Sequence, residues 1–185
     1  FAGAAGMPVA AFLVLNISGT LFRLYLVRRF GDAFDGPIDG IVEWIGDNRL
    51  PVLIIGEPGT GKETVARAIH SASLRAKGPL LSLDCKATAA NIVDSELFGH
   101  EKGAFPGAFA AKTGKVVQSD GGTLILDEIG CLPEQTQELL DRVLATGEVR
   151  PVGLNGSYSV DVRVIATSSR PLPDDFHTGL AERIG

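Results

Sequence analysis

Residues 52–64 read VLIIGEPGTGKET, and this stretch decides the fold of the chain. Its first four residues are apolar, which is typical of a strand buried in a parallel sheet. The segment Gly56–Lys62 follows directly and matches the pattern G-x-x-x-x-G-K. Glycines in such a loop let successive backbone N–H groups turn inward around an anion, and a helix beginning near Lys62 directs its positive end at that anion. The pattern predicts a site for nucleotide phosphates.

The side chains of this loop predict the contacts of the phosphates. Lys62 would add a positive charge beside the β- and γ-phosphates. Glu63 stands where the general pattern has a serine or threonine for magnesium, and Thr64 follows one place later. The alternative is a glycine-rich turn with an incidental lysine, but the flanking strand and helix favour a phosphate loop. The candidate nucleotide-binding residues are Gly56, Glu57, Pro58, Gly59, Thr60, Gly61, Lys62, Glu63 and Thr64.

A second apolar run, Leu124–Leu126, ends in the adjacent acids Asp127 and Glu128. Two neighbouring carboxylates at a strand end are costly unless a cation lies beside them. A strand next to the phosphate loop can bring Asp127 to Mg²⁺, through water, while Glu128 orients or deprotonates the attacking water. The pair therefore predicts hydrolysis of ATP or GTP, and the sequence contains no N-K-x-D pattern for reading guanine.

Apolar strands and amphipathic helices alternate along the rest of the chain. We expect strands at 52–55, 80–83, 123–126 and 162–166, and helices at 38–45, 64–71, 89–97 and from Pro133 to Gly147. The helix at 64–71 should turn Val65, Ala68 and Ile69 inward. Because the strands are apolar without alternation, an α/β fold with a parallel sheet covered on both faces is expected.

Charge is distributed unevenly over the 185 residues, which carry 17 basic and 22 acidic side chains and a net charge of −5. Residues 1–31 carry three arginines and no acid, so residues 32–185 have a net charge of −8. A body this acidic is unsuited to clamping nucleic acid by charge alone. The two cysteines, Cys85 and Cys131, are too few for a disulfide scaffold or a four-cysteine zinc site, and we expect both to be buried.

The first 22 residues have no charged side chain. The apolar run Val9–Leu15 is shorter than the roughly 20 residues that a membrane-spanning helix needs. Two interpretations stay open, a membrane-proximal segment within residues 1–27 and a piece of a neighbouring domain. We therefore separate residues 1–31, whose role is unassigned, from a domain at 32–185, and expect a cytoplasmic protein.

These motifs together resemble the AAA+ domain of bacterial enhancer-binding proteins, the sigma-54-dependent transcriptional activators. The resemblance covers roughly residues 34–185 and includes Glu63 after the lysine, the acidic motif at 121–129 and the loop at 94–108. It implies an α/β P-loop NTPase fold of AAA+ type, and we expect the helical lid of that fold to be missing from this fragment. It also implies that ATP and Mg²⁺ bind between subunits of a homo-oligomeric ring, commonly a hexamer.

The same resemblance implies the partners. Hydrolysis in this family moves a loop against the sigma-54 RNA polymerase holoenzyme to open promoter DNA, and DNA itself would be bound only through a domain absent from this chain. Phe105, between two glycines, suits a mobile hydrophobic tip, although a phenylalanine folded into its own core is the alternative. Pro106 replaces the family's threonine, fixes φ and removes a donor. The loop residues are Gly103, Ala104, Phe105, Pro106, Gly107 and Ala108.

Other positions also depart from the family pattern. Asp84 stands at the position of an asparagine, the switch residue that holds the catalytic glutamate, and Asp84 cannot donate an amide hydrogen bond to Glu128. Ser169 occupies the sensor position, where it is expected to bond a water or the γ-phosphate. Two family arginines that act in trans on a neighbour's ATP fall at His177 and Arg183, so only Arg183 is retained.

We therefore expect an ATP-hydrolysing domain of a sigma-54-dependent transcriptional regulator. Asp84, Pro106 and His177 keep a first alternative open, a divergent regulator that binds ATP without activating sigma-54. A second alternative is a P-loop ATPase that acts outside transcription.

Overall fold

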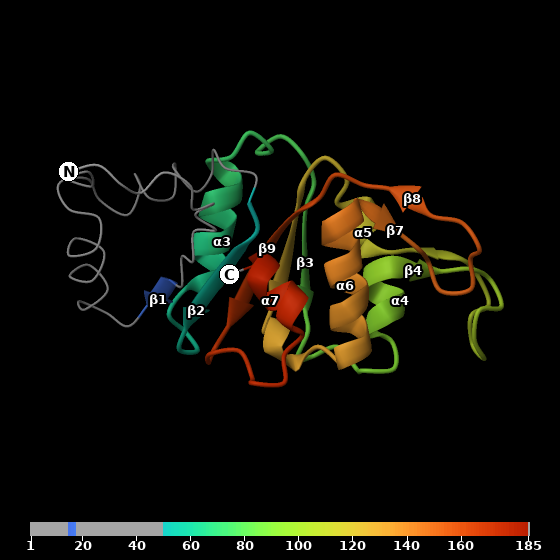
Figure 1. The fold of residues 1–185 in the computed structure, drawn as a ribbon. Coiled ribbons are helices and arrows are strands. Elements are labelled where there is room, and N and C mark those ends of the chain that lie inside the picture. The colour runs from blue at the N-terminus through green and yellow to red at the C-terminus, as the bar shows by residue number, and fades with distance from the viewer. Residues whose placement is uncertain (1–14, 18–49, 185) are drawn as a thin grey trace, which may run out of the picture.

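The computed structural model describes residues 15–17 and 50–184 (Figure 1). The predicted helix at 38–45, and most of the segment at 1–31, lie outside the described residues. None of the helices in the described part of the chain is long and apolar enough to cross a membrane.

A parallel sheet forms the centre of the molecule, with the strand order β1-β2-β9-β6-β3. The four predicted strands are confirmed, each with slightly different ends, and β1 adds an unpredicted strand beside β2. The carboxyl ends of the strands all point toward the lower edge of Figure 1. The bounds are Leu15–Ile17 for β1, Val52–Gly56 for β2, Leu80–Asp84 for β3, Thr123–Asp127 for β6 and Arg163–Ser168 for β9.

Helices cover both faces of this sheet, as the apolar strands predicted (Figure 1). Alternate residues of a strand face opposite sides, so β2 sends Ile54 toward α3 and Leu53 toward the other helices. The larger core lies on the second face, where Phe98 and Leu140 are buried. The bounds are Lys62–Ser71 for α3, Val93–Phe98 for α4, Lys115–Gln118 for α5, Glu134–Thr146 for α6 and Thr178–Ile184 for α7.

The inward face of α3 differs from the prediction. Ala68 is exposed and Val65 is only half-buried, whereas Ala66, Ile69 and His70 are buried. The sequence pattern counted only apolar side chains and so left out His70. This ring is accepted in the core because its Nδ1 lies 2.9 Å from the hydroxyl of Thr123 on β6.

Two further predictions need correction. The helix expected at 89–97 begins only at Val93, because residues 85–92 form turns after β3. Cys85 is buried as expected, but Cys131 is exposed, since it ends the short 3-10 turn Ile129–Cys131 that leaves the sheet after β6. The predicted end of α6 is confirmed, and Gly147 follows it with a left-handed φ of 69°.

Two small hairpins lie at the far end of the molecule from β1 (Figure 1). One pairs β4 (Gly99–His100) with β5 (Lys112–Thr113) and encloses the glycine-rich loop. The other pairs β7 (Glu148–Val149) with β8 (Tyr158–Ser159). A bridge between His100 and Val152 joins the two hairpins, so the glycine-rich loop is supported from one side.

Candidate functional site

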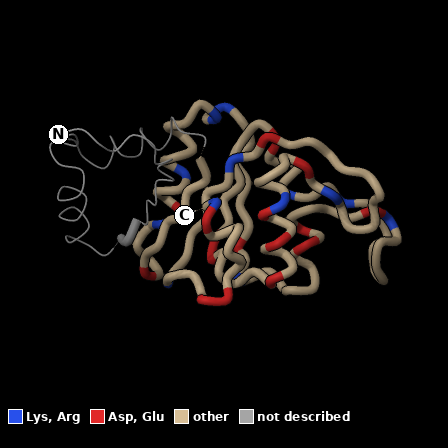
Figure 2. Tube along the Cα trace, in the orientation of Figure 1, with Lys and Arg blue, Asp and Glu red and all other residues tan. Residues whose placement is uncertain are grey.

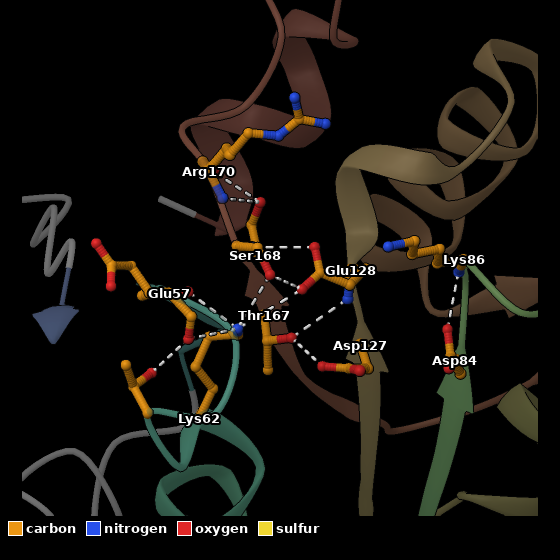
Figure 3. Close-up of polar contacts among 12 residues, drawn as sticks. Glu57, Lys62, Asp84, Lys86, Asp127, Glu128, Thr167, Ser168 and Arg170 are labelled. Carbon is orange, nitrogen blue, oxygen red and sulfur yellow. Dashed lines mark hydrogen bonds and ion pairs between the residues drawn. The ribbon is translucent and has the colours of Figure 1, made fainter. Parts of the chain in front are cut away.

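The phosphate loop turns between β2 and α3 at the carboxyl end of the sheet. Gly59 and Gly61 have φ values of 81° and 85°, the left-handed region that favours glycine, so the loop depends on these residues for conformation. Lys62 is the first residue of α3 and is only 7% exposed. Its Nζ donates to the carbonyl of Gly56 at 2.9 Å and lies 3.4 Å from that of Glu57 (Figure 3).

The other predicted loop residues lie at the surface. Glu57, Pro58 and Gly59 are exposed, so the loop is open to a ligand from solvent. Thr60 uses its hydroxyl to donate to the Glu57 carbonyl at 2.8 Å. Glu63 pairs with Arg67 one helical turn later, at 2.6 Å, and Thr64 is exposed. The structure therefore gives Glu63 a partner on the outer face of α3.

Asp127 and Glu128 follow from the end of β6 and are organised by Thr167 of β9 (Figure 3). The Thr167 hydroxyl donates to Asp127 Oδ1 and accepts a hydrogen bond from the Glu128 N–H at 3.2 Å. Thr167 is fully buried, so its hydroxyl is fixed between the two acids. Thr167 could not be predicted as a site residue, because it lies within a strand whose other residues are explained by packing.

Glu128 has a strained backbone, with a φ of 54° that no other non-glycine residue in the described part of the chain shares. Such a conformation costs about 1–3 kcal/mol and is found preferentially at functional sites. The Glu128 side chain points toward the end of β9 (Figure 3). The strain therefore supports a functional role for Glu128.

Ser169 and Lys62 hold the Glu128 carboxylate. Ser169 donates to it twice, from its backbone N–H to Oε2 at 3.0 Å and from its hydroxyl to Oε1. The Nζ of Lys62 lies 3.6 Å from Oε1 and 3.2 Å from the Ser169 hydroxyl. Burial by itself would raise the pKa of Glu128, but the Ser169 hydrogen bonds and the Lys62 charge outweigh it and lower that pKa. Glu128 is therefore a carboxylate at neutral pH.

Asp84 is directed elsewhere. Its Oδ1 accepts hydrogen bonds from the backbone N–H groups of Lys86 at 2.9 Å and Ala87 at 2.8 Å, which fixes the turn after β3 (Figure 3). Asp84 pairs with Asp127 in the sheet register. The hydrogen bonds to the Glu128 carboxylate come instead from Ser169, which follows β9. In the sheet, β9 and β3 lie on opposite sides of β6.

His177 and Arg183 stand at the positions of the two family arginines that act on a neighbouring subunit's ATP. Arg183 lies on α7, and His177 directly precedes this helix. His177 accepts a hydrogen bond at Nδ1 from the Leu180 N–H at 3.2 Å and so caps the start of α7. Arg183 donates from Nε to Asp141 Oδ1 of α6 at 2.8 Å. Both side chains are thus engaged within their own subunit.

The glycine-rich loop carries two exposed aromatic rings. Phe105 is 37% exposed and packs edge-on against His100, with ring centroids 4.9 Å apart. Phe109, which was not predicted as a loop contact residue because it lies just outside the motif at 103–108, is 87% exposed. A Cβ on Gly153 of the neighbouring hairpin would come within 2.8 Å of the Ala104 Cβ, so the two loops lie in close contact.

Acidic residues are more frequent toward the lower edge of the molecule, the edge at which the parallel strands end, and basic residues are more frequent above it (Figure 2). Among the described residues, no group of three or more His, Cys, Asp or Glu side chains could hold a metal ion by itself. A Mg²⁺ ion bound through Asp127 would take its other ligands from phosphates and water, as is usual for this ion.

Comparison with known proteins identifies the family. Residues 38–183 match the family model described as the sigma-54 interaction domain. The chain belongs to this family. Among curated members, it is 49% identical over 138 residues to the Nif-specific regulatory protein of Rhodobacter capsulatus, covering 75% of this chain and 24% of that protein. It is 48% identical over 135 residues to the transcriptional regulatory protein ZraR of Escherichia coli, covering 73% and 31%. It thus spans a quarter to a third of these relatives.

Solved structures agree with this assignment. The crystal structure of NtrX from Brucella abortus in complex with ATP has a TM-score of 0.73 and 30% identity, covering 92% of this chain and 35% of that one. The P-loop NTPase domain of a sigma-54 transport activator from E. coli has a TM-score of 0.53 at 17% identity, covering 78% of this chain and 98% of that one, which supports the fold alone. The predicted P-loop NTPase fold of AAA+ type is confirmed.

Proposed function

We propose that this sigma-54 interaction domain binds ATP and hydrolyses it as part of a sigma-54-dependent transcriptional regulator. The observation that carries the proposal is that the phosphate loop and the end of β6 bring Lys62 and Glu128 to the same edge of the sheet, with the Lys62 Nζ 3.6 Å from Glu128 Oε1. The relation to NtrX, whose structure was solved with ATP, supports the choice of nucleotide. We assign the nucleotide-binding unit to residues 32–185.

The phosphates of ATP would lie in the loop at 56–62. The exposed turn at Gly59 provides access, and the N-terminus of α3 presents backbone N–H groups and positive dipole to the anion. Lys62 would move from the loop carbonyls to the β- and γ-phosphates. The remaining candidates around the phosphates are Glu57, Pro58, Thr60, Gly61, Glu63, Thr64 and, at the γ-phosphate, Ser169.

Asp127 fits a magnesium ligand that acts through water. Thr167 engages its Oδ1, which leaves Oδ2 as the oxygen to accept from a Mg²⁺-bound water. When bound, Mg²⁺ neutralises charge that develops on the transferred phosphoryl group. Glu128, already ionised and held at the same edge of the sheet, would orient the attacking water and accept its proton.

The glycine-rich loop and Arg183 on α7 are the features from which we propose the partners. The loop at 103–108, together with the more exposed Phe109, would contact the sigma-54 RNA polymerase holoenzyme. Arg183 would leave Asp141 to reach the ATP of a neighbouring subunit in a homo-oligomeric ring, commonly a hexamer in this family. DNA would be bound through a domain outside this chain. Such a regulator would act in the cytoplasm.

A second candidate function is a regulator that binds ATP without remodelling sigma-54 polymerase. It is favoured by the commitment of Asp84 to its own turn and of His177 to the cap of α7, together with Pro106 in the loop. A third candidate function is that of a P-loop ATPase that acts outside transcription.

Two measurements on the protein separate these functions. Phosphate release from ATP and sigma-54-dependent open-complex formation should both occur, and Glu128→Gln should abolish both while ATP still binds. Glu138→Gln, an exposed acid on α6, is the matched control and should have no effect. ATP turnover without open complexes would favour the second candidate or an ATPase outside transcription, and ATP binding without turnover by the native protein would contradict the proposed enzyme.

A further inference from the structure

The contact between Lys62, Glu128 and Ser169 is not the arrangement that hydrolysis needs. During hydrolysis, Lys62 must face phosphate and Glu128 must face water. In the structure these charged groups instead face each other, with side chains only 8% and 20% exposed. We call this three-residue contact the latch.

We propose that Ser169 is a positioning residue that closes the latch, so that a nucleotide can bind Lys62 only by opening it. This inference rests on the proposed function, because it concerns the same nucleotide site. It assigns to Ser169 a role before binding, in addition to a contact with the γ-phosphate afterwards.

The hydrogen-bond capacity of Lys62 supports this proposal. An ammonium group has three protons to donate. The structure gives it three acceptors within 3.4 Å, the carbonyls of Gly56 and Glu57 and the hydroxyl of Ser169, with Glu128 Oε1 close by. All three protons therefore have acceptors, and a phosphate must displace part of this set.

Glu128 is equally occupied. Its two carboxylate oxygens each accept a hydrogen bond from Ser169, one from the backbone N–H at 3.0 Å and one from the hydroxyl. Asp84 does not provide a substitute, because its Oδ1 already accepts from Lys86 and Ala87 and its charge would repel Glu128. Ser169 is thus the residue that keeps Glu128 beside Lys62.

The difference between ADP and ATP allows a direct test. ADP has no γ-phosphate, so loss of the Ser169 hydroxyl removes no contact from the ADP complex but weakens the latch. Ser169→Ala should therefore bind ADP more tightly, by about fivefold for one hydrogen bond of ordinary strength. Combining it with Glu128→Gln should give less than the product of the two single effects, because both changes open one contact.

Titration calorimetry of the chain with ADP provides the measurement, and Ser168→Ala is the matched control. The Ser168 hydroxyl donates to the Arg170 carbonyl at 2.5 Å, outside the latch, so this variant should keep the native Kd for ADP. Ser169→Thr retains the hydroxyl and should also keep the native Kd. Ser169→Cys, which is similar in size to serine and a weak donor, should tighten ADP binding if Ser169→Ala fails to fold.

An unchanged or weaker affinity of Ser169→Ala and Ser169→Cys for ADP would overturn the latch alone, because the native chain would still bind nucleotide. Absence of ADP binding to the native chain would overturn the proposed function and the latch with it. A general packing defect would weaken binding, so a gain in affinity is a result that a purely structural role of Ser169 does not produce.

Discussion

Thr167 positions two acidic residues with one buried hydroxyl. It donates to Asp127 and accepts from the backbone of Glu128, whose φ of 54° is otherwise unfavourable. A hydroxyl can play both parts because it has one proton and two lone pairs. The alignment of the predicted metal ligand and the predicted base therefore depends on a residue outside the acidic motif itself.

We predict that Thr167→Val, which conserves shape and removes the hydroxyl, lowers both stability and activity. The change leaves the half-buried Asp127 carboxylate and the Glu128 backbone N–H without this partner, which costs about 1–3 kcal/mol of the free energy of unfolding. Urea unfolding and phosphate release measure the two effects. Thr146→Val on the exposed surface of α6 is the control, and equal losses in both variants would contradict the role of Thr167.

His70 predicts a pH dependence of folding. Burial, followed by the nearby charge of Arg163, lowers the pKa of this histidine below its ordinary value of 6.5. The unfolded chain therefore takes up a proton near pH 6.5 that the folded chain resists, so stability should fall as the pH is lowered through this value. Glu128, whose pKa is lowered from 4.5, affects stability only at more acidic pH.

We expect His70→Asn, which can retain a hydrogen bond to Thr123, to remove this dependence. Urea unfolding between pH 7.5 and pH 5 should give a flatter stability curve for the variant than for the native chain. Two parallel curves would contradict the prediction.

At the scale of elements, the glycine-rich loop separates a supported base from an exposed tip. A hydrogen bond from the Gly103 N–H to the Ala108 carbonyl closes the loop at 2.8 Å, and the His100 ring packs against the ring of Phe105. Phe109 follows this closed segment and is almost entirely exposed. An apolar ring of this size in solvent is suited to contact with a partner.

We predict that Phe109→Ser weakens binding to sigma-54 polymerase while stability changes by no more than about 0.5 kcal/mol, as expected for an exposed side chain. A pull-down and thermal unfolding measure the two properties. Leu74, 77% exposed after α3, provides the control, since Leu74→Ser should leave partner binding unchanged. Equal partner binding by Phe109→Ser and the native chain would contradict the prediction.

Four of the five strands of the sheet were predictable from the sequence because they are largely apolar, and β2, β3 and β6 each end at a glycine or an acid, whereas β1 was not predicted. The phosphate loop was predictable for a related reason, since its chemistry depends on residue spacing along one segment. The latch was not, because Ser169 meets Lys62 and Glu128 only through the sheet order, 107 and 41 residues apart in sequence. Cys131 was expected to be buried, but composition does not predict how the turn after β6 leaves the sheet. His70 was not expected in the core, because the sequence does not show that its ring meets the buried hydroxyl of Thr123.

At the scale of the whole molecule, the proposed ring makes a prediction about two subunits. Arg183→Ala and Lys62→Ala should each be inactive alone, because the first lacks the trans arginine and the second lacks the phosphate lysine. Mixed in equal amounts, they should regain part of the ATP turnover, since Arg183 of the Lys62→Ala subunit can reach the intact site of its neighbour. A mixture as inactive as its components would contradict trans action by Arg183.

ATP binding at the phosphate loop is tested by an equilibrium titration of the chain with ATP and Mg²⁺, comparing the native chain with Lys62→Ala. Lys77→Ala, an exposed lysine beyond α3, is the matched control. We expect one ATP bound per native or Lys77→Ala chain, and an affinity at least about tenfold weaker for Lys62→Ala, because a hydrogen-bonded charge is removed from the phosphates. Equal ATP affinities for the native chain and a folded Lys62→Ala variant would contradict this expectation.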